Sequence, residues 1–328
     1  MIISKTPFRM SYVGGGTDIR TFYKDEPGAV ISTSINKYMY ITLHKKFDDK
    51  IRIAYSTVEE VDRIADISHP LVRESLLLTE LNEGVEITST ADIPGKGTGL
   101  GSSSSYTVGL LKALYAYKCI KADPYKIASE ACEIEINRCG EPIGKQDQFA
   151  ASFGGLKMYE FMPDETVNIH NIDCSNSFKN KLNNSCISFY LGSTRSASKI
   201  LEIQTKVSKN EEKKLILRRM AQIAREFKCG IEDSSFTTLV ELMNENWMLK
   251  KSLTKEISNN LIDEVYQAGI KAGARAGKLL GAGGGGFITF LAPKSAHKKI
   301  RESLPKLKEV NLEMESDGSQ IIYNERIY

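Results

Sequence analysis

Three glycine-rich segments constrain this chain of 328 residues more than any other feature of its sequence. They are residues 14–16 (GGG), residues 94–105 (PGKGTGLGSSSS) and residues 281–286 (GAGGGG). Glycine permits positive φ angles and lets a ligand approach the backbone closely, but it loses more conformational entropy on folding than other residues. Three such clusters in one chain therefore need a structural or functional reason.

The middle segment predicts a binding site for an anion. Apolar residues at helical spacing follow it, from Ser102 to about Cys119. Glycines that lead into a helix leave backbone N–H groups directed outward, and the helix dipole adds positive charge at the same end. One hydroxyl is enough to cap a helix, whereas residues 102–105 are four serines. The surplus hydroxyls could bind phosphate oxygens and a Mg²⁺ ion.

This segment differs from both common nucleotide-binding motifs. A Walker sequence needs Ser or Thr after its lysine, but Lys96 precedes Gly97, and Thr90 stands where the first glycine belongs. The pattern G-x-G-x-x-G would require glycine at Ser102. That pattern does occur within residues 281–286, but the strand-like sequence FITFLA follows it rather than a helix. We therefore exclude a Rossmann site.

Composition and charge restrict the class of protein. The 44 basic and 41 acidic side chains give a formal net charge of +3, which is too small to indicate binding to nucleic acid. Apolar runs such as 287–292 are far shorter than the ~20 residues that span a membrane. The opening MIISKTPFRMSY is not typical of a secretory signal, and the six cysteines include no CxxC pair. We predict a cytoplasmic enzyme with no membrane or nucleic-acid partner and reduced thiols.

Hydrophobic periodicity predicts an α+β protein, because strands precede helices rather than alternating strictly with them. The length suggests two domains at ~150 residues each, and the polar stretch 173–185 is the best candidate for their boundary. A basic cluster at 213–219 is typical of a solvated helix face. Expected strands are 37–43, 50–55, 85–90, 155–161, 186–191 and 286–292, with a final hairpin around Asp317 and Gly318. Expected helices are 102–119, 124–138, 196–209, 211–228, 232–251, 256–273 and 294–307.

Two acidic residues are candidates for chemistry. Glu135 shares a predicted helix face with the small residues Ala128, Ala131 and Cys132, so its carboxylate needs a partner there, which can be a metal ion or an Arg or Lys side chain. Asp147 follows a Pro-Ile-Gly turn and precedes an apolar stretch. It could simply cap a helix, but Lys145 nearby would favour its charged form, which suits a proton acceptor.

Taken together, TPFRMSYVGGGTD, PGKGTGLGSSSS and KLLGAGGGGF resemble, in order and spacing, the three motifs of the GHMP kinases. The likeness covers essentially the whole chain. It implies a two-lobed fold, with a mixed-sheet ATP-binding domain at residues 1–180 and a ferredoxin-like domain at residues 181–328. Within the family, GKQDQFAASFGG and TRSAS are most similar to the bacterial kinases that phosphorylate the anomeric oxygen of D-glycero-α-D-manno-heptose 7-phosphate.

The resemblance implies where ATP, Mg²⁺ and the reacting proton are bound. Glu135 stands five residues before the glycine of a G-x-P sequence, where the family has a Mg²⁺ ligand, and Ser103 would be the second ligand. Asp147 matches the aspartate of the galactokinase sequence GxxDQ and would be the catalytic base, with Arg9 beside it. Residues expected to bind the ATP phosphates are Pro94, Gly95, Lys96, Gly97, Gly99, Leu100, Gly101, Ser102, Ser103 and Ser104.

The resemblance also suggests how the sugar is held. Asp18 matches a galactokinase aspartate that accepts hydrogen bonds from sugar hydroxyls, whereas Gly15 and Gly16 replace a Glu-His pair, which argues against galactose and leaves room for a larger sugar. Gly283 is expected to border the substrate, in a tight loop between a helix and a strand beside the phosphate site. The substrate's own phosphate would need cations and hydroxyls, for which the candidates are Lys145, Arg20, Arg195, Thr194, Ser196 and Ser198.

Other functions remain open at this stage. The same chemistry could act on L-fucose, another hexose or a non-sugar alcohol, and a kinase fold can also persist as a non-catalytic sugar sensor. A sensor has no need of a base, so the joint presence of Ser103, Glu135 and Asp147 favours an enzyme. A pyridine-nucleotide enzyme is a distant alternative. The expected partners are a sugar phosphate and ATP, with a homodimer possible.

Overall fold

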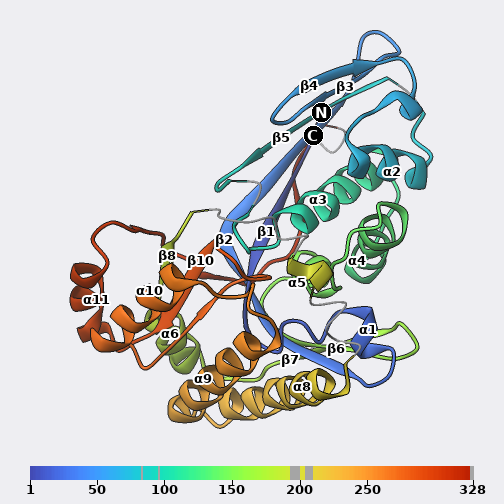
Figure 1. Cartoon of the computed structure of the whole chain (residues 1–328). Coiled ribbons are helices and arrows are strands. Elements are labelled where there is room, and N and C mark those ends of the chain that lie inside the picture. Colours follow the sequence, from blue (N-terminus) through green and yellow to red (C-terminus); the bar gives the residue numbers. More distant parts are fainter. Residues whose placement is uncertain (83, 95–96, 193–199, 204–209, 326–328) are drawn as a thin grey trace.

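The computed structural model describes residues 1–82, 84–94, 97–192, 200–203 and 210–325. These residues form two lobes, each built on one sheet (Figure 1). The larger sheet contains both parallel and antiparallel pairs, and the smaller sheet is antiparallel. The α+β class and the mixed sheet of the first lobe are therefore confirmed.

Strand β2 (Gly28–Lys45) organises the large sheet. It pairs with β1 (Ile2–Val13) on one side. On the other side its second half pairs with β5 (Val85–Ala91) and its first half with β6 (Leu156–Phe161). The sheet continues from β5 to β3 (Ile51–Ala54) and β4 (Val58–Val61), and from β6 to β7 (Val167–Asn171). A single long strand thus carries both halves of the first lobe.

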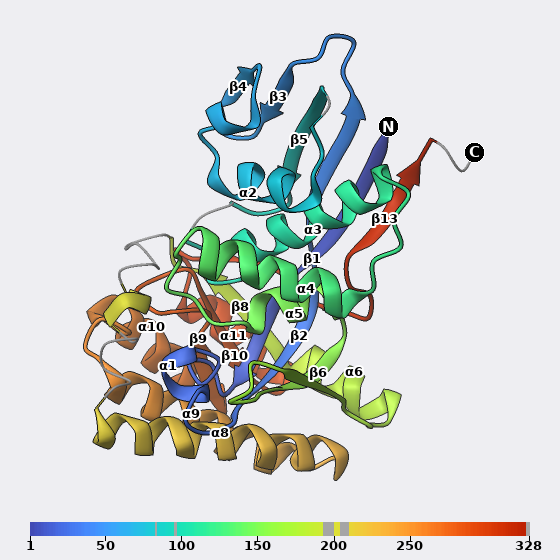
Figure 2. The same ribbon diagram turned by 90° about the vertical axis from the view of Figure 1, so that its right-hand side faces the viewer.

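Helices pack together on one side of this sheet (Figure 2). Helix α3 (Ser102–Tyr117) lies against β1 and β2 and is buried along most of its length. Around it lie α2 (Pro70–Thr79), α4 (Pro124–Cys132) with its π-helical continuation η2 (Glu133–Arg138), and α5 (Gln146–Phe153). The short helix α1 (Arg20–Tyr23) follows β1, and a 3₁₀ turn η1 (Ile64–Asp66) precedes α2.

The small sheet has the order β11 (Lys308–Glu309), β8 (Cys186–Tyr190), β10 (Phe287–Leu291) and β9 (Ala276–Leu279). Its helices are α6 (Asn176–Ser185), α8 (Glu211–Glu232), α9 (Phe236–Leu253), α10 (Asn260–Lys271) and α11 (His297–Ser303), the last preceded by the 3₁₀ turn η3 (Lys294–Ala296). One apolar core joins the two lobes. For example, Tyr12 of β1 stacks on Phe227 of α8 with ring centroids 5.7 Å apart.

Local structure differs from the sequence-based expectation in two places near the chain's polar segments. Residues 176–185, within the polar stretch proposed as the domain boundary, form helix α6, because Ser175 caps it (Phe178 N donates to its Oγ at 3.2 Å) and Phe178 and Leu182 are buried. The residues around Asp317 and Gly318 do not form a hairpin. Instead β12 (Met314–Glu315) pairs with β2, and β13 (Gln320–Asn324) pairs with β1. The chain end therefore returns to the large sheet, and a division near residue 180 stays a prediction.

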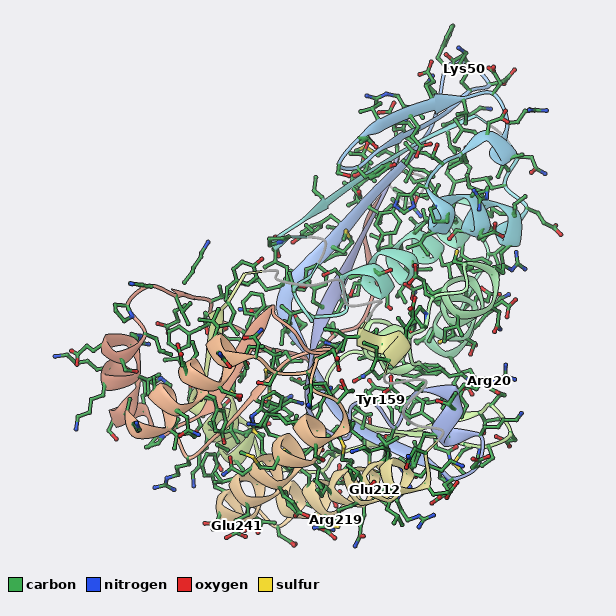
Figure 3. The ribbon with its side chains drawn as sticks, in the orientation of Figure 1. Arg20, Lys50, Tyr159, Glu212, Arg219 and Glu241 are labelled. Carbon is green, nitrogen blue, oxygen red and sulfur yellow. The ribbon has the colours of Figure 1, made fainter. Side chains whose placement is uncertain are left out.

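The basic residues of α8 form ion pairs instead of an open patch. Lys214 bonds to Asp25 at 2.8 Å, and Arg219 to Glu245 at 2.6 Å. Figure 3 shows Arg219 at the periphery of the molecule. The helix predicted at 196–209 falls mostly outside the described residues. The part that the structure describes, residues 200–203, is helical. Among the described residues every helix is too short or too polar to span a lipid bilayer.

Candidate active site

Arg9 of β1 and Asp147 of α5 form a two-point ion pair beside the start of α3. Arg9 Nε donates to Asp147 Oδ1 at 2.7 Å, and Nη2 donates to Oδ2 at 2.8 Å. The arginine side chain is 4% exposed and the aspartate side chain 23%. Arg9 also donates from Nη1 to the carbonyl of Gly99. The predicted contact between Arg9 and Asp147 is confirmed, and it connects the sheet to the glycine-rich segment.

The glycine-rich segment folds as a tight turn that opens α3. Gly97, Gly99 and Gly101 have φ angles of 72°, 74° and 77°, a region that favours glycine. In the described part of the chain no side chain caps α3, because its N-cap residue is Gly101. A Cβ on Gly101 would lie 3.1 Å from Asp147 Oδ2, so glycine lets the carboxylate approach the helix start closely. This is the geometry expected of an anion site, although Gly95 and Lys96 lie outside the described residues.

The third glycine-rich loop lies directly against this turn. A Cβ on Gly281 would lie 2.4 Å from Gly99 Cα, and one on Gly286 would lie 2.4 Å from the Thr98 carbonyl oxygen. The loop joins strand β9 to strand β10, so the prediction of a helix before it is wrong; residues 276–279 pair with β10 instead. A Cβ on Gly283 would meet Ile257 at 2.8 Å, and its contact with a substrate stays a prediction.

Glu135 is fully buried between α3 and α5, with two side chains donating to it. Ser103 Oγ donates to Oε1 at 2.6 Å, and Gln148 Nε2 donates to Oε2 at 2.6 Å. Burial raises the pKa of Glu135 to about 7, against the opposing effect of the hydrogen bonds from Ser103, Ser104 and Gln148. Among the described residues no ion pair involves Glu135, so the arginine or lysine partner considered above is not what the structure contains.

Asp18 lies near Asp147 and is 3% exposed. Gly16 N donates to its Oδ1 at 2.9 Å, and Gln146 N donates to its Oδ2 at 3.3 Å. A Cβ on Gly144 would lie only 1.9 Å from Oδ2, so the turn before α5 must be glycine to admit the carboxylate. Burial, and then the charge of Asp147, raise the pKa of Asp18. The structure thus brings the two predicted aspartates together.

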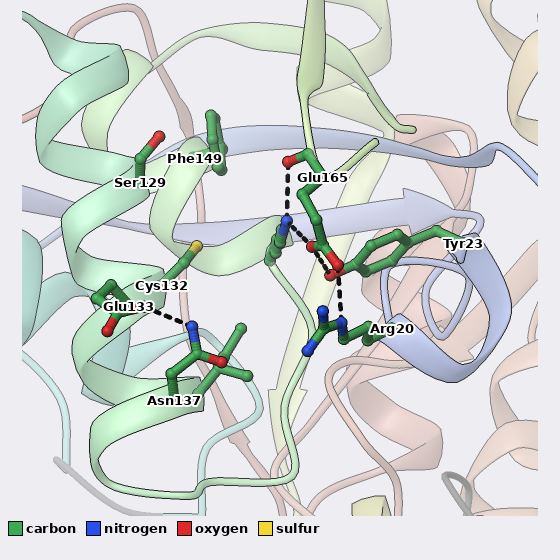
Figure 4. A pocket seen from close by; sticks show the side chains of 10 residues that line it. Arg20, Tyr23, Ser129, Cys132, Glu133, Asn137, Phe149 and Glu165 are labelled. Atoms are coloured by element: carbon green, nitrogen blue, oxygen red, sulfur yellow. Dashed lines mark hydrogen bonds and ion pairs between the residues drawn. The ribbon is translucent and has the colours of Figure 1, made fainter. Parts of the chain in front are cut away.

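Lys145 does not accompany Asp147 as predicted. It precedes α5, and its side chain extends to the turn between β6 and β7, where Nζ donates to Glu165 Oε2 at 2.6 Å and to the Glu165 carbonyl at 2.9 Å. Arg20 pairs with the same carboxylate at 2.7 Å, and Tyr23 also donates to it (Figure 4). These four residues help to line a pocket of about 220 Å³ together with Ser129, Cys132, Glu133, Ile136, Asn137 and Phe149. Arg195, Thr194, Ser196 and Ser198 lie outside the described residues.

Comparison with known proteins decides the family. Residues 65–155 match the model of the GHMP kinases N terminal domain, and residues 227–309 match that of the GHMP kinases C terminal domain. A curated D-glycero-alpha-D-manno-heptose 7-phosphate kinase of Campylobacter jejuni is 30% identical over 321 residues, which cover 93% of each chain. The chain belongs to the GHMP kinase family. It is a sugar kinase, a phosphotransferase that acts on an alcohol group of a sugar.

Solved GHMP kinase structures share the fold. A putative sugar kinase from Campylobacter jejuni is 27% identical with a TM-score of 0.77, over 98% of both chains. A structure described as a D-glycero-D-manno-heptose 1-phosphate kinase from Bacteriodes thetaiotaomicron has a TM-score of 0.80 at 24% identity, over 99% of this chain and 100% of that one. The two-lobed GHMP kinase fold is therefore confirmed.

Three polar side chains that this GHMP kinase buries at its centre were not predicted from the sequence. Asn246 and Lys250 lie on the inner face of α9, where Gly14 N donates to Asn246 Oδ1 at 2.9 Å and Lys250 Nζ donates to the Gly281 carbonyl at 2.8 Å. Lys278 of β9 donates to the carbonyls of Ser11 and Tyr12 at 2.8 and 3.0 Å. A signal existed for the first two, because positions 239, 243, 246, 250 and 253 form one helical stripe that is otherwise apolar.

Proposed function

We propose that this kinase transfers the γ-phosphoryl group of Mg-ATP to the anomeric hydroxyl of D-glycero-D-manno-heptose 7-phosphate, giving the 1,7-bisphosphate and ADP in the cytoplasm. The observation that carries the proposal is the Arg9–Asp147 pair at the open start of α3, with Asp18 beside it. The curated Campylobacter jejuni relative, whose name states this substrate, supports the choice of sugar.

The ATP phosphates would bind at the start of α3. Main-chain N–H groups of Ser102, Ser103 and Ser104 and the turn at residues 97–101 offer positive charge there without a side-chain cap. Pro94, Gly95, Lys96 and Leu100 would complete this segment. The role we assign to it depends on main-chain geometry rather than on a Walker lysine.

Magnesium fits the residues around Glu135. The described residues hold no cluster of three or more His, Cys, Asp or Glu side chains for a metal. However, Mg²⁺ in kinases takes only one or two protein oxygens and completes its shell with phosphate and water. Glu135 and Ser103 would supply those two oxygens. A buried carboxylate that has no cationic partner among the described residues is the donor such an ion needs. When bound, the ion would neutralise charge on the phosphates.

Asp147 would accept the proton of the anomeric hydroxyl, and Arg9 would hold it in position. The two parallel hydrogen bonds from Arg9 fix both oxygens of the carboxylate, which a lysine could not do. Phosphoryl transfer passes through a loose transition state, so positioning matters more than basicity and the proton moves late. Asp18, fixed by two backbone amides, would accept hydrogen bonds from the sugar hydroxyls.

The 7-phosphate of the sugar would bind at the cationic side of the site. Lys145 and Arg20 both pair with Glu165 in the pocket of Figure 4. In the sequence, Lys145 is two residues from Asp147, and Arg20 is two residues from Asp18. Arg195 is the third candidate. Gly15 and Gly16 leave the space that a seven-carbon sugar needs, and Gly283 would border it from the other lobe.

A coupled assay of ADP release tests the substrate. The wild-type protein with Mg-ATP should turn over heptose 7-phosphate far better than mannose, galactose or L-fucose, and the product should carry its new phosphate on the anomeric carbon, visible by ³¹P NMR. Turnover of free hexoses but not of the phosphorylated heptose would overturn the assignment of the sugar.

A further inference from the structure

A lysine from the second lobe reaches the reaction centre of the first. Lys250 is near the end of α9 and is only 5% exposed. Its ammonium donates to the carbonyl of Gly281 at 2.8 Å, in the loop that lies on Gly99 at the start of α3. The side chain therefore contacts the loop that packs on the segment proposed to hold the ATP phosphates.

The same ammonium borders the proposed sugar site. A Cβ on Gly15 would lie 3.5 Å from Lys250 Nζ and 3.7 Å from Gln146 Nε2. Glycine at position 15 thus keeps a space open beside the ammonium, and any other residue would fill it. Lys250 Nζ lies where the donor phosphates and the acceptor sugar would meet.

Most donors and acceptors around Lys250 already have partners. Asp147 is held by Arg9, and Asp18 by two backbone amides. Lys278, the other buried lysine here, donates to two main-chain carbonyls. Within the described residues Lys250 has no carboxylate within 4.0 Å. An ammonium has three N–H donors, and among the described residues only the one to Gly281 has an acceptor.

We propose that Lys250 is a catalytic residue whose ammonium binds the phosphoryl group as it moves from ATP to the sugar. The inference rests on the proposed phosphoryl transfer but not on the identity of the sugar. The bond from phosphorus to the ADP oxygen breaks and a bond to the sugar oxygen forms, the sugar's proton goes to Asp147, and Lys250 keeps its own proton. Negative charge spreads over the phosphoryl oxygens in this step, and a fixed cation in a water-poor site stabilises it.

The charged groups that face Lys250 give the proposal a pH signature. They are Asp18 and Asp147, which favour the ammonium, and Arg9 and Lys278, which oppose it. Burial is the largest effect and lowers the pKa of Lys250 to about 8. The ammonium is therefore present below pH 8 and lost above it in the free enzyme. We expect kcat/KM to fall as the pH rises through about 8, and kcat to fall only at higher pH, because bound phosphates favour the charged form.

The kinetic test compares Lys250→Met, Lys250→Arg and the control Lys251→Met. Lys251 is the neighbouring lysine, paired with Asp263 at 3.0 Å outside the site. Lys250→Met should lower kcat by about 10²–10³-fold with little change in either KM, the loss typical of removing one transition-state donor. Lys250→Arg should retain part of the activity and lose the alkaline limb near pH 8, because arginine keeps its charge. Lys251→Met should match the wild type.

Stability separates this role from a structural one. Burial disfavours the charged form of Lys250, so an apolar side chain of similar length removes the cost of burying that charge. We therefore expect the melting temperature of Lys250→Met to equal or exceed that of the wild type. A strong fall in melting temperature, with the lost activity explained by unfolding, would assign Lys250 to lobe packing and overturn the proposal.

A binding measurement makes the test independent of the sugar. Aluminium fluoride with Mg-ADP mimics a phosphoryl group in transfer, and calorimetry compares ADP affinity with and without it. Lys250→Met should bind ADP with the same affinity as the wild type, but aluminium fluoride should no longer increase that affinity. An unchanged gain would refute the role of Lys250, whether or not heptose 7-phosphate is the substrate. Conversely, the wild type could fail to phosphorylate heptose 7-phosphate and still gain ADP affinity from aluminium fluoride. That result would refute only the proposed sugar.

Discussion

Ser103 and Glu135 meet across the gap between α3 and η2, with the serine hydroxyl donating to Oε1 at 2.6 Å. The carboxylate is fully buried and faces no cation among the described residues. The structure thus holds a charged group at a position where burial favours its neutral form. This relationship gives the first prediction.

Glu135 should make the stability of the ligand-free protein depend on pH. Burial raises its pKa from 4.5 to about 7 in the folded state. Its contribution to the free energy of unfolding is therefore fully present below pH 4.5 and is lost as the pH rises through about 7. The full loss in the free energy of unfolding is on the order of 3 kcal/mol, from 1.36 kcal/mol per pKa unit. Melting curves of wild type and Glu135→Gln between pH 5 and 8 measure it.

The difference in melting temperature between the wild type and Glu135→Gln should narrow when Mg²⁺ and a non-hydrolysable ATP analogue are added, because the bound ion stabilises the ionised carboxylate. A ligand-free wild type whose melting temperature follows that of Glu135→Gln at every pH would contradict the raised pKa.

Removing the base should abolish most of the activity without weakening nucleotide binding. Asp147→Asn keeps the shape but cannot accept a proton, and general bases contribute about 10²–10⁴-fold to the rate. Arg9→Lys keeps the charge but loses the two-point contact. We expect both variants to lower kcat, measured by ADP release. Affinity for ATP should stay the same in Asp147→Asn, and a large loss there would place Asp147 among the ATP contacts instead.

The cations around Glu165 should act on the sugar phosphate alone. Lys145→Met should raise KM for the phosphorylated sugar much more than KM for ATP. Arg195→Ala, outside the described residues, is expected to do the same. Lys24 is the control, since its ammonium lies 3.9 Å from the same carboxylate but its side chain does not line the pocket. Lys24→Met should leave both constants unchanged. Equal effects of Lys145→Met on the two substrates would remove Lys145 from the phosphate site.

Gly281 and Gly140 form a matched pair for the contact between the lobes. Their φ angles are similar, 78° and 69°, so alanine strains both backbones by about 1–2 kcal/mol. At Gly281 the new Cβ would also meet Gly99 Cα at 2.4 Å, whereas at Gly140 nothing lies within 4 Å. Gly281→Ala should therefore melt well below Gly140→Ala and raise KM for ATP. Equal melting temperatures would show that the two loops can separate.

The parts of the fold with strong periodicity could be predicted from the sequence. Helix α3 and its glycine turn were identified, because the apolar spacing and the run of serines coincide there. Strand β1 was missed, since Ser4, Thr6, Arg9 and Ser11 are buried and break the apolar pattern. Helix α6 was missed because its buried residues, Phe178 and Leu182, are isolated in a polar sequence.

The site could be predicted only where motifs mark it. Arg9 and Asp18 flank the first glycine-rich segment, Glu135 precedes a G-x-P sequence, and Asp147 lies in a sequence that matches GxxDQ. The partner of each cation depends on how the side chains extend from their elements, so Lys145 was assigned to Asp147 although it pairs with Glu165. Lys250 carries no motif, and only its place on the apolar stripe of α9 distinguishes it from Lys251 beside it.

A crystal structure with Mg²⁺, a non-hydrolysable ATP analogue and heptose 7-phosphate tests the central claim most directly. We expect the triphosphate against the main-chain N–H groups of residues 102–104, the metal between Ser103 and Glu135, and the anomeric oxygen within hydrogen-bond distance of Asp147. A triphosphate bound elsewhere, with Glu135 far from any metal, would contradict the account.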